Sequence, residues 1–208
     1  MNQALRVRPY DGDLLLAVGT EAAVRGDSAE AFELWRRSFA IRGSHRLRIA
    51  RLVAGNMPPE AWLEWLQPEW DSLPVFWSTA CDRIDDQQRA AILAYGQARL
   101  ESDLSESTPP FATRARRTLA EMQLTAGLPE AAAATLEQAI AANPNDVPTR
   151  RMLGFVLANL QRLPEAEQHL SWCYGRNPND GGVQRQLTTI RKLRLAETAD
   201  QRRASLLR

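Results

Sequence analysis

Few residues of this 208-residue sequence are spaced for chemistry. With two histidines, His45 and His169, and two cysteines, Cys81 and Cys173, we expect no metal site. His169 precedes Ser171 and Cys173 in one predicted helix, as a nucleophile and its base would need. Cys173, however, falls on a small-residue core position, where a thiol behaves as a small hydrophobe. We therefore expect no enzyme activity, no catalytic residue and no cofactor.

Composition places the chain among globular proteins, with 44% hydrophobic and 25% charged residues and a formal net charge of +1. The longest apolar run near the start, Leu14 to Val18, is too short for a membrane span or a signal-peptide core. We therefore expect a soluble protein; the sequence leaves the compartment open, although it favours the cytoplasm. Basic ends flank an acidic middle, residues 52–112. Because nucleic acid and membrane surfaces require one continuous positive face, we expect neither as a partner.

The strongest pattern is a period: Asn143-Pro144-Asn145-Asp146 recurs as Asn177-Pro178-Asn179-Asp180, 34 residues later. Apolar residues within each period fall at helical spacing on two segments, which predicts two amphipathic helices per unit. One such pair buries its apolar side only by stacking on the next. The same offset relates Arg117 to Arg151, Leu119 to Leu153, Ala132 to Ala166, Leu136 to Leu170, and Ala139 to Cys173.

This pattern resembles the tetratricopeptide repeat. The large–small pair of the family's first helix corresponds to Leu119-Ala120 and Leu153-Gly154, and its closing proline to Pro144 and Pro178. The turn glycine is present as Gly127 but is replaced by Gln161 in the second unit. The resemblance implies an all-α, right-handed α-solenoid of helical hairpins.

The same frame reaches the N-terminus with weaker matches. A unit starting at Gly12 places Gly26, Ala31 and Trp35 in register, so we expect the chain to open partway through a hairpin. The opening helix is either a stub or the cut edge of a longer repeat protein. We predict four segments: an N-terminal repeat-like unit with a partial helix over 1–45, an irregular helical segment over 46–112, two regular units over 113–180, and a basic capping helix over 181–208.

Tryptophans gather in the irregular segment, where four of the six lie between residues 62 and 77. Trp62 and Trp65 share one face of a predicted helix. Thr108 is expected to N-cap a helix that begins at Pro109. The rings of the segment 57–77 either fill gaps left by irregular packing or form an exposed patch for a partner, and both interpretations stay open.

The resemblance also implies a binding surface. In this family the first helices line a concave groove, and the fifth position of each unit points into it. That position is Arg117, Arg151 and Arg185 in three successive units. The candidate binding residues are therefore Arg114, Arg117, Arg151, Phe155, Arg185 and Lys192. Guanidinium groups hold carboxylates through paired hydrogen bonds, which favours acidic ligands. The alternative is a solvated arginine face.

The function that the sequence favours is a non-enzymatic scaffold that docks a protein or peptide partner in this groove. One alternative is a soluble accessory domain of a larger enzyme, such as a membrane-bound enzyme of surface-glycan assembly. This rests on a faint likeness of residues 57–70 to repeat-bearing tails of such proteins. A second alternative is a homo-oligomer that stacks through exposed repeat ends.

Overall fold

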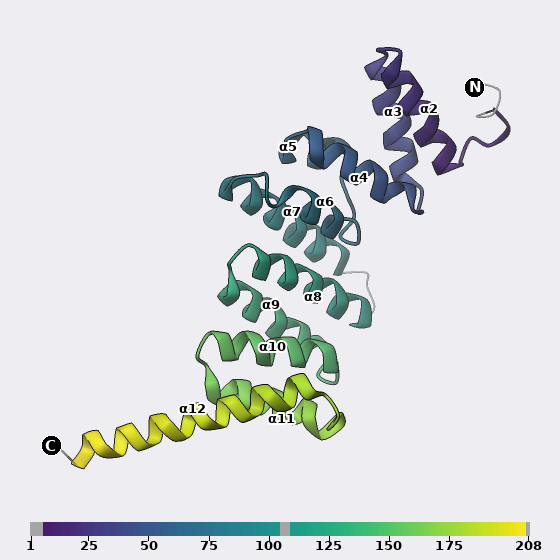
Figure 1. The fold of residues 1–208 in the computed structure, drawn as a ribbon. Coiled ribbons are helices and arrows are strands. Elements are labelled where there is room, and N and C mark those ends of the chain that lie inside the picture. The colour runs from purple at the N-terminus through teal and green to yellow at the C-terminus, as the bar shows by residue number, and fades with distance from the viewer. Residues whose placement is uncertain (1–5, 105–108, 207–208) are drawn as a thin grey trace. The chain divides into compact units, whose positions relative to one another are not determined.

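The structure, a computed structural model, describes residues 6–104 and 109–206, which form two compact units, Met1–Arg99 and Leu100–Arg208. Every regular element within these residues is an α-helix (Figure 1), which confirms the all-α fold class. None of the described helices is long and apolar enough to cross a membrane. The division of the sequence into four segments stays a prediction.

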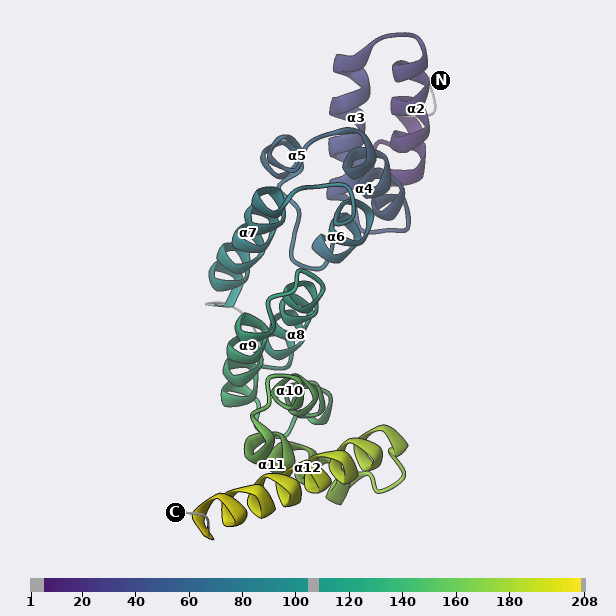
Figure 2. The ribbon, with the colours of Figure 1, turned by 60° about the vertical axis from the view of Figure 1, so that its left-hand side comes forward.

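The C-terminal unit contains two helical hairpins and a long last helix. α8 packs against α9 and α10 against α11, while α9 contacts α10 and α11 contacts α12 (Figures 1 and 2). These helices are α8 Pro109–Thr125, α9 Pro129–Ala142, α10 Val147–Asn159, α11 Leu163–Arg176 and α12 Gly181–Leu206. The expected cap Thr108 lies outside the described residues, whereas Pro109 does begin a helix.

Turn residues fix where the helices of each hairpin end. Gly127 adopts φ 76° and Gln161, at the same place in the next unit, φ 60°. A residue with a Cβ pays about 1–2 kcal/mol in this left-handed region, so the Gln161 turn is the more strained of the two. Asp146 then caps the N-terminus of α10, where its side chain accepts a hydrogen bond from the Thr149 N–H at 2.9 Å.

The core of this unit follows the repeat. Leu136, Leu153, Leu157 and Leu170 are completely buried in one continuous cluster. Small residues allow the helices to approach: a Cβ on Gly154 would lie 2.6 Å from Leu170 Cδ2. The apolar positions that recur every 34 residues in the sequence are therefore those that pack between helices.

The N-terminal unit begins with a hairpin whose two helices are both capped by aspartate. Later helices are less regular: α5 has only eight residues and ends at Gln67, which has φ 44°. The elements are α2 Gly12–Val24, α3 Ser28–Ala40, α4 His45–Asn56, α5 Pro59–Leu66, α6 Leu73–Ala80 and α7 Asp86–Leu104, the last of which starts in this unit.

His45 is a core residue of this unit. It is the first residue of α4 and only 4% exposed. Its ring fits against two glycines, because a Cβ on Gly12 or Gly43 would lie 2.2 or 2.4 Å from His45 Cε1. Its Nε2 lies 2.8 Å from the carbonyl oxygen of Ile41. The imidazole therefore ties the start of α2 to the start of α4.

The tryptophans divide between the two roles that the sequence left open. Trp62 and Trp77 are buried, and the Trp62 ring stacks on Phe76 with centroids 4.4 Å apart. Trp65 and Trp70 are only half-buried. Part of the segment is therefore core, and part of it reaches the surface.

Candidate functional site

An arginine on the first helix of each regular unit contacts the start of the next unit. On α8, Arg117 Nη1 lies 3.3 Å from Asp146 Oδ2. On α10, Arg151 Nε donates a hydrogen bond to Asp180 Oδ2 at 2.8 Å. Both carboxylates also cap the helix that follows them, α10 and α12 respectively. The repeated tetrapeptide thus supplies both the helix cap and the partner of the arginine.

In the Arg151–Asp180 pair, the charged carboxylate is stabilised more by the backbone of α12 than by the arginine. The pKa of Asp180 lies below its ordinary value, chiefly because the Val183 backbone N–H donates to the carboxylate and also because Arg151 does so. Arg151 keeps 44% of its side chain exposed and Asp180 keeps 24%. Because water screens such a pair, it orients the groups more than it stabilises the fold.

Phe155 lies beside this pair. The Arg151 guanidinium carbon is 4.8 Å from the centroid of the half-buried Phe155 ring, a cation–π contact. Gly182 leaves room for the guanidinium, because a Cβ there would lie 3.0 Å from Arg151 Nη2. The structure therefore brings together two of the six predicted binding residues.

Three predicted binding residues, Arg114, Arg185 and Lys192, are exposed on the first helices α8 and α12. In the part of the chain that the structure describes, no carboxylate lies within ion-pair distance of them. Arg191 and Arg194 differ, since both pair with Glu167 of α11. Arg114, Arg185 and Lys192 are therefore exposed cations without a carboxylate partner among the described residues.

The thiol and imidazole of α11 are not arranged as a reactive pair. Cys173 is 2% exposed, and burial raises the pKa of its thiol, which disfavours the nucleophilic thiolate. Burial lowers the pKa of His169, whose Nδ1 is buried without a hydrogen-bond partner among the described residues. Residues 6–104 and 109–206 contain no group of three or more His, Cys, Asp or Glu side chains that could hold a metal ion.

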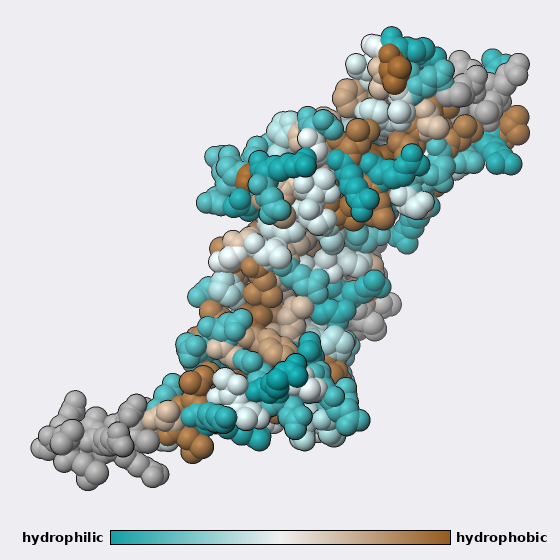
Figure 3. Space-filling model, in the orientation of Figure 1, coloured by the Kyte–Doolittle hydropathy of each residue, from teal (hydrophilic) through white to brown (hydrophobic). Residues whose placement is uncertain are grey.

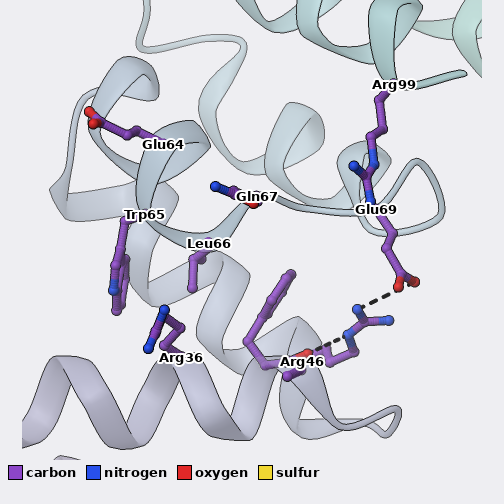
Figure 4. A pocket seen from close by; sticks show the side chains of 10 residues that line it. Arg36, Arg46, Glu64, Trp65, Leu66, Gln67, Glu69 and Arg99 are labelled. Carbon is purple, nitrogen blue, oxygen red and sulfur yellow. Dashed lines mark hydrogen bonds and ion pairs between the residues drawn. The ribbon is translucent and has the colours of Figure 1, made fainter. Parts of the chain in front are cut away.

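A site that sequence reasoning missed lies in the N-terminal unit. A pocket of about 520 Å³ opens there, and its walls come from α3, α4, α5, the loop after α5, and α7 (Figure 4). The ten lining residues include two aromatic rings and three arginines. The sequence signal was the tryptophan-rich segment 57–77, whose Trp65 lies near the end of the short helix α5.

Comparisons with known proteins agree with the helical-hairpin fold. Residues 113–171 match the family model described as tetratricopeptide repeat. Among solved structures, the crystal structure of YrrB, a tetratricopeptide repeat protein with an unusual peptide-binding site, is 12% identical with a TM-score of 0.51; the match covers 92% of this chain and 97% of that one. The APC/C hetero-tetramer Cut9–Hcn1 is 15% identical with a TM-score of 0.51, covering 91% of this chain but only 38% of that one. No curated protein gives a significant match.

The hairpins and their repeated contacts define a helical-repeat fold. Its segment 113–171 matches the tetratricopeptide repeat family. Proteins of this family are generally non-enzymatic binding scaffolds.

Proposed function

We propose that this protein is a scaffold that docks an acidic segment of a partner protein on the first helices of its C-terminal unit. The observation that carries the proposal is the set of exposed cations, Arg114, Arg185 and Lys192, without a carboxylate partner among the described residues. Arg117 lies on α8 together with Arg114, and Arg151 and Phe155 lie on α10, the first helix of the next repeat. The six residues together form the acidic-ligand face.

The two kinds of cation have different tasks on this face. Arg117 and Arg151 each use part of the guanidinium on a capping aspartate, so their position is fixed before a ligand arrives. The exposed cations attract a carboxylate and, in the case of the arginines, hold it through paired hydrogen bonds. The half-buried Phe155 offers an apolar contact beside them. Charge selects the ligand, while apolar contact supplies affinity.

The experiment selects peptides from a random phage-displayed library on the immobilised protein. We expect enrichment of sequences rich in aspartate and glutamate. The variant Arg114→Gln/Arg185→Gln/Lys192→Gln should lose binding to the enriched peptides. The control Ala134→Glu/Gln138→Glu/Gln168→Glu changes the net charge equally but on exposed positions of the second helices, and it should keep binding. Equal loss in both variants would reject the acidic-ligand face.

Self-stacking through the first hairpin stays a prediction, and self-stacking through α12 has little support. Figure 3 shows mostly hydrophilic side chains along α12, with hydrophobic ones only next to its grey end. The exposed large apolar residues there are Leu193 and Leu195. Because a stacked end needs a continuous apolar surface, this helix acts better as a polar cover. The accessory-domain alternative stays a prediction.

A further inference from the structure

The pocket of the N-terminal unit exists because α5 is short. α5 has eight residues, whereas α9 and α11 of the regular units have 14 each. At 1.5 Å per residue, the difference shortens the helix by roughly 9 Å. The left-handed backbone of Gln67 then turns the chain away. The C-terminal part of α3, with Arg36, Phe39 and Ala40, therefore lines an open cavity instead of a helix interface.

One side of this pocket is apolar. Phe39 and Leu66 are buried beneath it, and the half-buried Trp65 lines its edge. The Trp65 ring meets Phe32 edge to face with centroids 4.9 Å apart, and Phe32 is 37% exposed. An aromatic or branched aliphatic side chain of a ligand would find matching rings here.

A fixed guanidinium lies at the other side. The Arg46 side chain is only 11% exposed; its Nε donates to the Phe39 carbonyl oxygen at 2.8 Å, and its guanidinium carbon lies 4.8 Å from the Phe39 ring centroid. Its terminal nitrogens form ion pairs with Glu69 at 3.6 Å and with Asp71 at 3.8 Å. These distances exceed a hydrogen bond, so within the described residues the terminal N–H groups keep donors that a ligand can use.

Two further arginines reach the same cavity. Arg36 comes from α3 with 57% of its side chain exposed and donates a hydrogen bond to Glu33 at 3.1 Å, which leaves its other N–H groups for a ligand. Arg99 extends from α7 toward the Glu69 loop (Figure 4). Glu64 lines the cavity too, but Figure 4 shows its carboxylate directed away from Arg46. The interior of the pocket thus joins guanidinium donors to aromatic walls.

We propose that this pocket binds a short segment of a partner protein in which a glutamate or aspartate side chain lies next to an aromatic residue. The carboxylate is held by Arg46 and Arg36, and the ring packs against Trp65 and Phe39. A volume of about 520 Å³ lies within the usual range of ligand pockets. The site is separate from the acidic-ligand face and does not depend on it.

The test uses a fluorescein-labelled peptide, Gly-Ser-Glu-Phe-Glu-Ser-Gly, acetylated and amidated at its ends, and its analogue with glutamine in place of glutamate. Fluorescence anisotropy should show saturable binding of the acidic peptide alone. Two neighbouring arginines give matched variants: Arg36→Gln should weaken binding about tenfold, whereas Arg37→Gln, which does not line the pocket, should leave it unchanged.

A second matched pair lies on the same helix. Ala40→Glu places a carboxylate in the pocket and should abolish binding, while Ala29→Glu on the exposed first turn of α3 should not. Helical circular dichroism shows that each variant is folded. Absence of saturable binding to the natural sequence, equal binding of the glutamine peptide, or equal loss in both members of a pair would overturn the proposal. Binding that requires a free peptide C-terminus would do so as well.

Discussion

Arg151 Nε donates a hydrogen bond to Asp180 Oδ2 at 2.8 Å, and one repeat earlier Arg117 Nη1 lies 3.3 Å from Asp146 Oδ2. The same two residue types, at the same offset, join each unit to the next. The aspartate accepts a hydrogen bond from the arginine and also caps the following helix. Different substitutions of the aspartate can therefore separate the ion pair from the helix cap.

Asp180→Ala should lower the free energy of unfolding by about 1–2 kcal/mol, because the N-terminus of α12 loses its cap and Arg151 loses its partner. Asp180→Asn keeps a capping oxygen and removes only the charge, so its cost should be clearly smaller. Urea unfolding followed by circular dichroism measures both. An asparagine variant as unstable as the alanine variant would show that the charge, and not the cap, dominates.

Acid should destabilise the C-terminal unit through carboxylates whose pKa is lowered in the folded state. The pKa of Asp180 lies below its ordinary 3.8, and that of Glu167 below its ordinary 4.5, the latter chiefly because Arg191 donates to it. Such groups contribute stability above the unfolded pKa, and the contribution is lost as pH falls through the folded pKa. The part of the urea midpoint that these carboxylates contribute should therefore be constant near neutral pH and be lost below about pH 4. Asp180→Asn should reduce this fall; an unchanged slope would contradict it.

His169 should add a second pH dependence of stability, at higher pH than that of the carboxylates. Burial lowers the pKa of its imidazole from 6.5, so the folded state favours the neutral ring while the unfolded chain binds a proton more readily. Stability is then complete above about pH 6.5 and falls as pH decreases below it. His169→Gln should remove this component and leave the acid component in place. The measurement is the thermal midpoint across the pH range, and a variant with the natural profile would exclude His169 as its source.

Gly154→Ala should destabilise the hairpin of α10 and α11 by about 1–3 kcal/mol, because the added Cβ would lie 2.6 Å from Leu170 Cδ2. Leu170→Ala alone leaves a cavity. The double variant should be more stable than the sum of the two single effects predicts, since the small side chain makes room for the new methyl group. Additive unfolding energies would show that the contact is relieved in another way.

The sequence predicted the regular part of the fold well, because local pattern and packing coincide there. Leu153, Ala166 and Leu170 each repeat a residue of the same type 34 positions earlier, and all three are buried in the helix interfaces. The burial of His45 was not predicted, because the space for its ring depends on the distant Gly12 as well as on Gly43.

The candidate site was harder to predict, since it depends on contacts between successive repeats of the C-terminal unit. The arginines of the period were visible in the sequence, and so were Asp146 and Asp180, but their pairing across 29 positions required the hairpin geometry. The pocket beside Trp65 was missed because it results from where α5 stops. The left-handed Gln67 that ends α5 carries no sequence signature of its own.

The paired arginines and aspartates have a consequence for how such a protein can change. Each junction pairs one positive with one negative group, while Arg114, Arg185 and Lys192 support no junction in the described structure. If the proposed acidic-ligand face binds as inferred, substitutions at these three outer positions would change ligand preference and leave the contacts between repeats intact. Arg117 and Arg151 serve both purposes, so evolution would be free to vary the outer cations but not the junction arginines.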